Sequence, residues 1–354
     1  MRFVGLTLLG GLMAMLAHAH EAPGARWSAE QANAWYAAQP WIVGCNFIPS
    51  TAINQLEMWQ ADTFDAAAID RELGWAAGLG MNAVRVYLHD LAWETDADGF
   101  TKRMDQYLAI ADKHGIRTLF VIFDDCWNAD PKAGPQPAPK PGVHNSGWLQ
   151  SPGQRVVNAP DEWGRLERYL KDILSTFAKD RRVLLWDLYN EPGNEGQGEK
   201  SLPLLKQAFE WAQAVRPDQP LSVGIWNKNA LYGDFLLDAV DVITFHNYGP
   251  LDDIEGQVRD LKTHERPVIC TEWLRRTGGS DVASHLPFFK RERVGCFNWG
   301  LVSGKTQTIY PWGSKEGGPE PPVWFHDLLR PDGTPFSADE AELFRSLTQS
   351  AGKE

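Results

Sequence analysis

The chain has 354 residues, of which 43% are hydrophobic and 23% are charged, and its formal net charge is -12. A chain of this size can bury a large core, and single α/β barrels reach this length, so no second domain is required. The acidic charge would repel a polyanion, which excludes nucleic acid as a partner and favours an uncharged ligand.

Residues 1–19 have the pattern of a secretory signal peptide. Arg2 precedes the apolar run Val4–Leu16, and Ala17-His18-Ala19 supplies the small residues that signal peptidases accept. We predict cleavage after Ala19 and export to the periplasm or the medium, with an uncleaved anchor as the alternative. The run is short for a membrane span and no later stretch approaches about twenty apolar residues, so we expect no stable membrane insertion.

Short runs rich in β-branched and aromatic residues predict strands, and longer segments of helical period separate them. The eight predicted strands span residues 41–48, 82–88, 118–124, 183–189, 221–226, 240–247, 267–273 and 294–301. Alternation of strand and helix implies parallel pairing, because each return to the same edge of a sheet needs a crossover. Eight such units close into a (β/α)8 TIM barrel, so we predict the α/β class and one domain over residues 20–354.

The helices are predicted from apolar periodicity and from capping residues. Apolar residues recur over 69–79 before Gly80, over 166–177 after the cap candidate Asp161, and over 205–215. The last helix is predicted over 337–347, with Ser337 as its N-cap. We interpret the segment before it, 323–335, as structural completion of the barrel.

Two proline-rich insertions follow predicted strands, at residues 128–160 and 304–322. They could be disordered surface loops. They could equally be walls around a site, because the chemistry of barrels lies on the loops that follow the strands. The sequence leaves both interpretations open.

Two glutamates end predicted strands. Glu191 follows Asn190 at the end of the fourth strand, and Glu272 lies at the end of the seventh. Carboxylates at the C-terminal tips of barrel strands face the mouth, so these two could flank one bond. Glycoside hydrolysis needs such a pair: an acid for the leaving oxygen, and a carboxylate that attacks or activates water.

Further polar residues occur at the same ends of their strands. Arg85 lies in the apolar second strand, where its charge needs a counterion. A nearby Glu272 would supply one and would be kept unprotonated, as a nucleophile must be. His246 and Tyr248 lie at the end of the sixth strand, and Trp299 lies in the eighth.

The ordered set of these motifs resembles the clan A glycoside hydrolases, most closely glycoside hydrolase family five, the cellulase and mannanase family. The resemblance implies a retaining β-glycosidase that cleaves β-linked polysaccharides or oligosaccharides through a covalent glycosyl-enzyme, without metal or organic cofactor. It implies that Glu191 is the acid/base and Glu272 the nucleophile. It further implies roles for residues around them: Asn190 contacting the sugar 2-hydroxyl, Arg85 and Tyr248 holding Glu272, His246 lining the cleft and Trp299 forming a sugar platform.

The chain departs from the family in one region. Family five enzymes commonly carry a histidine on the third strand or just after it, whereas this chain has Phe-Asp-Asp-Cys-Trp-Asn at 123–128. Asp124 and Asp125, together with Trp127, could bind sugar hydroxyls, or the acidic pair could cap the next loop. The departure leaves the substrate open among β-glucan, β-mannan, xylan and small β-glycosides.

Two other functional classes would fit parts of this pattern. A non-catalytic carbohydrate-binding barrel would keep an aromatic cleft, but it would not need both glutamates. A metal-dependent hydrolase would need clustered His and Asp ligands, and His246 lacks a neighbouring His-x-His signature. We therefore expect no metal site.

The cysteines are Cys45, Cys126, Cys270 and Cys296, and each falls in or at the end of an apolar run. We interpret them as buried thiols. A bridge between Cys270 and Cys296 stays open, since neighbouring strands would carry them.

Overall fold

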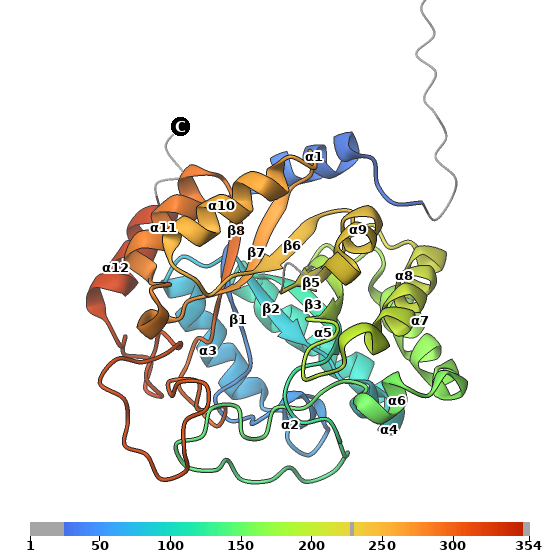
Figure 1. Ribbon diagram of the computed structural model, residues 1–354. Helices are drawn as coiled ribbons and strands as arrows, with labels where there is room; N and C mark the ends of the chain where they lie inside the picture. The colour runs from blue at the N-terminus through green and yellow to red at the C-terminus, as the bar shows by residue number, and fades with distance from the viewer. Residues whose placement is uncertain (1–24, 227–229, 350–354) are drawn as a thin grey trace, which may run out of the picture.

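The computed structural model describes residues 25–226 and 230–349, so the predicted signal peptide lies outside the described residues. Within this part of the chain, eight parallel strands pair in sequence order and close into a barrel, with β1 against β8 (Figure 1). The strands are β1 (Val43–Asn46), β2 (Ala83–Tyr87), β3 (Arg117–Asp124), β4 (Val183–Asn190), β5 (Leu221–Ile225), β6 (Ile243–His246), β7 (Val268–Trp273) and β8 (Gly295–Trp299). The predicted α/β class and TIM barrel are confirmed.

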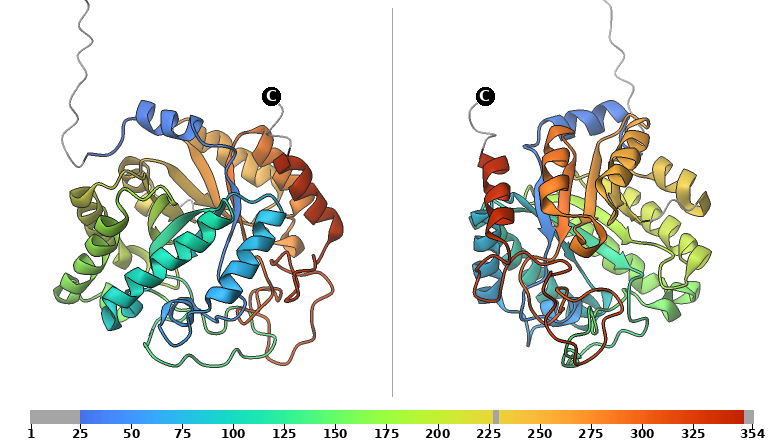
Figure 2. Two further views of the ribbon diagram at one scale, coloured as in Figure 1. Left: turned by 180° about the vertical axis from the view of Figure 1, so that it is seen from behind. Right: turned by 60° about the vertical axis from the view of Figure 1, so that its left-hand side comes forward.

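Helices surround the strands (Figures 1 and 2). The α-helices of the described residues are α1 (Ala29–Ala37), α2 (Gln55–Trp59), α3 (Ala66–Gly78), α4 (Asp90–Thr95), α5 (Ala97–Lys113), α6 (Gln154–Val157), α7 (Gly164–Phe177), α8 (Leu202–Val215), α9 (Ala230–Ala239), α10 (Leu251–Lys262), α11 (Val282–Arg291) and α12 (Ala338–Gln349). Short 3-10 turns lie at Pro160–Glu162, Gly198–Ser201 and Arg276–Gly278. Among these helices, none has both the length and the apolar character that crossing a membrane requires.

The capping predictions have mixed outcomes. The apolar stripe of α7 is buried as expected, but Asp161 is not its cap. Asp161 lies in the 3-10 turn that precedes α7, and Trp163 occupies the N-cap position without a side-chain hydrogen bond. For α12 the prediction is confirmed, because the Ser337 Oγ accepts a hydrogen bond from the Glu340 amide at 3.3 Å.

The four cysteines lie within the described residues, and all are buried free thiols. Cys270 on β7 and Cys296 on β8 are register partners, as the predicted strand order requires. The thiols are not joined in this structure.

The two insertions fold against each other at the carboxyl ends of the strands, at the end of the barrel opposite α1 (Figures 1 and 2). Backbone hydrogen bonds join Asn145 N to Thr306 O at 2.9 Å and Gly317 N to Pro141 O at 2.8 Å. The Gln307 side chain accepts from Gly142 N at 2.8 Å and donates to Lys140 O at 2.7 Å. We call residues 140–148 and 304–317 together the wall, and its ordered contacts favour the second interpretation of the insertions.

Candidate active site

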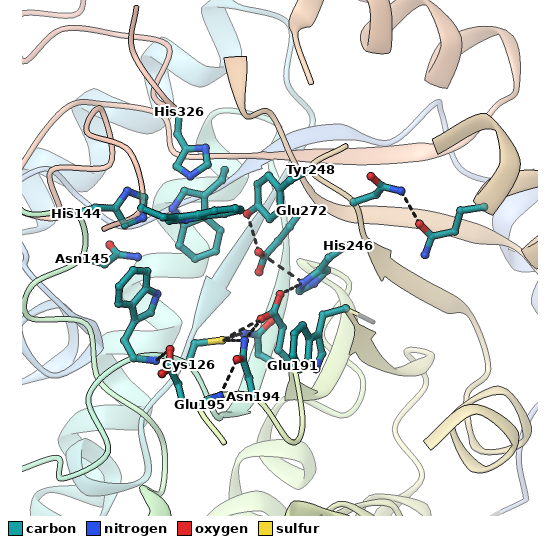
Figure 3. Close-up of a pocket in the computed structure, with 17 residues that line it drawn as sticks. Cys126, His144, Asn145, Glu191, Asn194, Glu195, His246, Tyr248, Glu272 and His326 are labelled. Atoms are coloured by element: carbon teal, nitrogen blue, oxygen red, sulfur yellow. Dashed lines mark hydrogen bonds and ion pairs between the residues drawn. The ribbon is translucent and has the colours of Figure 1, made fainter. Parts of the chain in front are cut away.

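A cavity of about 560 Å³ opens at the carboxyl ends of the strands (Figure 3). Most of the predicted site residues line it: Trp127, Asn190, Glu191, His246, Tyr248, Glu272 and Trp299. Arg85, Asp124 and Asp125 are buried behind this lining rather than in it.

Glu272 is held by three donors at the end of β7. Arg85 Nη1 and the Tyr87 hydroxyl both donate to Oε1 at 2.8 Å. The Tyr248 hydroxyl donates to Oε2 at 2.7 Å (Figure 3). The predicted ion pair with Arg85 is therefore present, and Tyr87 adds a contact that the sequence analysis did not include. The carboxylate is fixed in direction while it still lines the cavity.

Arg85 is fully buried and needs more than one partner. It pairs with Asp187 on β4 at 2.7 Å and donates to the Asn190 Oδ1 at 2.7 Å and to the Asn46 Oδ1 at 2.9 Å. Removing one member of such a buried network costs about 3–5 kcal/mol, because it leaves a charge without a partner. Arg85 thus links Glu272 on β7 with Asn190 next to Glu191.

Glu191 follows β4 with a φ of 45°, in the left-handed region. Its Oε2 accepts from the Asn194 amide at 2.5 Å and from the Cys126 thiol at 3.2 Å (Figure 3). Its Oε1 lies 2.6 Å from His246 Nδ1. Burial is the main cause that raises the pKa of Glu191 above its usual range.

His246 is a neutral imidazole near neutral pH, because burial lowers its pKa to about 4. One proton therefore lies between Glu191 Oε1 and His246 Nδ1: the acid form of Glu191 can donate to the ring, and the carboxylate form can accept from it. The pair can stay hydrogen-bonded in both protonation states of Glu191, provided that the ring changes tautomer.

Glu191, His246 and Glu272 each offer a possible metal-ligand atom, and these atoms lie within 4.8 Å of one another. Two carboxylates and an imidazole could hold a cation. However, the Arg85 guanidinium contacts Glu272 Oε1 directly, and its charge opposes a second cation at that oxygen. The donor set fits a hydrogen-bonded carboxylate better than a metal ligand.

Asp124 and Asp125 hold the protein's own groups. Asp124 accepts from the Cys126 amide and the Asn190 amide at 2.9 Å and from Trp148 Nε1 at 2.8 Å. Asp125 accepts from the Tyr189 hydroxyl and from Gly193 N at 2.7 Å. Burial raises their pKa values to about 7 and about 6. These contacts favour the capping interpretation over direct binding of sugar hydroxyls.

Several residues of the cavity are absent from the sequence-based prediction. They are Cys126, His144, Asn145, Asn194, Trp226, Trp312 and His326. His326 belongs to the segment interpreted as structural completion, so that interpretation is incomplete: its side chain also lines the cavity. Loops bring most of these residues to the site, and loops carry no periodic signal.

The closed barrel and the paired glutamates at the ends of β4 and β7 define a barrel of the glycoside hydrolase type. The family model "Cellulase (glycosyl hydrolase family 5)" matches residues 50–304. The chain belongs to this family, and the predicted resemblance is confirmed.

Solved structures similar to this chain share its fold at low sequence identity. A GH5_18 enzyme from Streptomyces cattleya in complex with GlcNAc is 14% identical, with a TM-score of 0.61 over 88% of this chain and 80% of the other. The exo-β-1,4-mannosidase Op5Man5 from Opitutaceae bacterium strain TAV5 is 17% identical, with a TM-score of 0.60 over 88% and 60%. The endo-1,4-β-mannanase from Rhizomucor miehei is 13% identical, with a TM-score of 0.59 over 90% and 96%. No curated protein sequence matches the chain.

Proposed function

We propose that this family member is a retaining β-glycosidase in which Glu272 is the nucleophile and Glu191 the acid/base. The observation that carries the proposal is the difference between the two carboxyl groups. Glu272 receives three hydrogen bonds, one from a guanidinium, as suits an anion that attacks. Burial raises the pKa of Glu191, as suits a group that starts the reaction protonated.

The spacing of the two groups supports retention. Single oxygen atoms of Glu191 and Glu272 lie within 4.8 Å of each other. Retaining enzymes place the carboxyl groups about 5–5.5 Å apart, whereas inverting enzymes leave about 6.5–9.5 Å for a water molecule. An oxygen–oxygen separation within 4.8 Å agrees with the shorter, retaining arrangement.

The reaction then proceeds in two displacements. Glu272 attacks the anomeric carbon and forms an ester bond, while the glycosidic bond breaks and its oxygen takes the proton of Glu191. Glu191, now a carboxylate, accepts a proton from water as the water oxygen attacks the same carbon. The ester bond breaks, and both glutamates return to their starting states.

Azide distinguishes the two roles. In Glu191→Ala, a substrate with an acidic phenol leaving group should still form the intermediate, and azide should attack it to give a glycosyl azide of the substrate's own anomeric configuration. In Glu272→Ala, azide should replace the nucleophile and give the opposite anomer. NMR of the products reads both outcomes.

Each alternative result has a clear meaning. Exchanged anomers would reverse the roles, and full activity in both variants would place the catalytic site elsewhere. Early wild-type product with inverted configuration would contradict retention. Glycan binding by the wild type without turnover would favour the non-catalytic barrel.

The structural neighbours guide the choice of substrate. Those described above include an exo-β-1,4-mannosidase and an endo-1,4-β-mannanase, and a GH5_18 variant was solved with Manβ1-4GlcNAc. We therefore propose a neutral β-linked glycan as substrate and β-1,4-mannosides as the first compounds to test, ahead of glucosides and xylosides.

We also propose that the protein is exported, on the pattern of residues 1–19. The intact mass of protein from the periplasm or medium should correspond to a chain that begins near His20. An exported form that keeps Met1 would refute cleavage.

A further inference from the structure

The cavity is closed on one side by the wall. His144, in the first insertion, is hydrogen-bonded to the second insertion. Its backbone amide donates to the Ser314 Oγ at 3.1 Å, and its Nδ1 donates to Tyr310 O at 2.7 Å. The wall also contacts the loop after β1, because Lys305 N donates to Ser50 O at 3.0 Å and the Asn54 amide donates to Gly147 O at 2.9 Å. A glycan lying across the barrel mouth would meet this barrier.

Three buried groups of this side present hydrogen-bond acceptors. His144 and His326 line the cavity, and each has its Nδ1 against a backbone carbonyl, Tyr310 O and Leu274 O respectively. A carbonyl only accepts, so each Nδ1 carries the proton, and each Nε2 of the neutral ring is an acceptor. Burial lowers the pKa of both rings, that of His144 to about 4, so they stay neutral when the enzyme works.

Asn145 is the third group. The residue is 1% exposed and lines the cavity, and its Oδ1 is buried without a hydrogen-bond partner among the described residues. A buried carbonyl oxygen without a partner costs about 1–3 kcal/mol, so a ligand hydroxyl there would recover that loss. Figure 3 shows His144, Asn145 and His326 on the same side of the cavity.

This side of the cavity lies next to Glu272. The ring of Tyr248, which donates to Glu272, contacts Trp312 at 5.1 Å and His326 at 5.5 Å between centroids. Trp226 lines the cavity beside Glu191, where its Nε1 donates to Pro192 O at 3.1 Å. Glu191 protonates the leaving oxygen, so the part of the glycan that departs should bind next to Trp226. The sugar that becomes attached to Glu272 should bind next to the wall.

We propose that the wall makes the cavity a pocket for the non-reducing end of a glycan, where His144, Asn145 and His326 accept hydrogen bonds from hydroxyls of the terminal sugar. The enzyme then cleaves from chain ends and releases a product of constant length. This inference rests on the proposed glycosidase function.

The first test uses β-1,4-manno-, cello- and xylo-oligosaccharides of three to six units with a fluorescent label at the reducing end. Early in the reaction, each length should give a single labelled product, shortened by the same number of units throughout. Several labelled products at once would show internal cutting and overturn the inference while leaving the glycosidase function intact. Wild-type protein that cleaves none of these and no 4-nitrophenyl β-mannoside, β-glucoside or β-xyloside would overturn both.

The second test addresses Asn145, whose φ of 48° is in the left-handed region. Asn145→Gly tolerates that backbone and removes the acceptor, so KM for the cleaved oligosaccharide should rise roughly tenfold with little change in kcat. Asn145→Asp keeps an acceptor oxygen and should stay closer to wild type. The matched control is Lys315→Ala, at an exposed position of the wall that does not line the cavity. Equal KM values in wild type and Asn145→Gly would overturn the role of Asn145.

Discussion

The Cys126 thiol shares Oε2 of Glu191 with the Asn194 amide. Burial, together with the negative charges of Glu191 and Asp124, raises the pKa of this thiol well above its ordinary value. It therefore stays protonated and donates to Glu191, but a thiol is a weak donor. A weak donor stabilises the carboxylate form only slightly, which helps Glu191 to remain an acid.

Replacing Cys126 should therefore move the pH profile. In Cys126→Ser the hydroxyl is a stronger donor, which favours the carboxylate and lowers the pKa of Glu191. The decline of kcat/KM on the alkaline side of the pH profile should therefore begin at a lower pH. In Cys126→Ala the donor is lost, so the alkaline decline of kcat/KM should begin at a higher pH. For Cys126→Ser we expect a shift of about 0.5–1 pH unit, from a hydrogen bond worth about 1 kcal/mol, and for Cys126→Ala a smaller shift, because the lost thiol is a weak donor.

The control for these variants is the leaving group. A 2,4-dinitrophenyl glycoside needs no proton from Glu191, so its kcat/KM should be nearly the same in wild type and in both variants. Equal losses on that substrate and on an alkyl glycoside would mean that Cys126 acts only through packing.

Strand geometry explains which residues the sequence could identify. Arg85, Glu191 and Glu272 lie on or just after strands, whose direction places them at one end of the barrel. Tyr87 could also have been found, because side chains two apart on a strand share a face and Tyr87 is two residues after Arg85. His144 and Asn145 could not, since contacts with Tyr310 and Thr306 in a distant insertion set their position.

At the scale of elements, β5 passes close beneath the site. A Cβ at Gly224 would lie 3.0 Å from His246 Nε2 and 3.3 Å from Arg85 Nη2. Gly224 also pairs in register with Asn190, the residue before Glu191. A methyl group here would be closer to His246 than an ordinary contact allows, so the ring would have to shift from its position against Glu191.

Gly224→Ala should displace His246 and lengthen its 2.6 Å contact with Glu191. We expect kcat/KM to fall roughly tenfold, since a misplacement of about 1 Å can cost about a hundredfold and the shift here is smaller. The control is Gly256→Ala on α10, where the nearest atom to an added Cβ is 3.8 Å away. Wild-type activity in Gly224→Ala would show that the strand can absorb the methyl group.

Elements were easier to predict than their ends. Every strand has the predicted place and order, because buried parallel strands are continuous apolar runs. The predicted cap of α7 was wrong. An acidic residue near the start of a helix is an N-cap only when its own backbone is non-helical, and Asp161 lies inside a 3-10 turn. The 3-10 turn at Pro160–Glu162 moves the start of α7 past Asp161.

At the scale of the molecule, buried titratable groups couple folding to pH. Burial raises the pKa of Asp327 to about 7, from a usual value of 3.8. A carboxyl group whose folded pKa is raised stabilises the fold fully below its unfolded pKa and loses that contribution as pH rises through the folded value. Buried His144 and His246 have pKa values lowered to about 4, so their contribution to the stability of the fold is lost as pH falls toward that value.

Asp327→Asn isolates one of these groups. The amide does not titrate, so the free energy of unfolding of the variant relative to wild type should increase between pH 4.5 and pH 7.5. This difference in unfolding free energy should change by about 1.4 kcal/mol for each unit by which the folded pKa of Asp327 exceeds its unfolded pKa. Urea unfolding of both proteins at several pH values gives this difference, in which the histidine contributions cancel. A constant difference would show that Asp327 has an ordinary pKa.

The backbone of Glu191, with its φ of 45°, affects which substitutions at this position the fold tolerates best. A left-handed conformation costs a residue with a side chain about 1–2 kcal/mol, which glycine avoids. Glu191→Gly should therefore be more stable than Glu191→Ala by about 1 kcal/mol in denaturant titrations. Glycine at 191 would relieve this backbone strain but would remove the proposed acid/base, so heat resistance and turnover must be screened together when this protein is evolved in the laboratory.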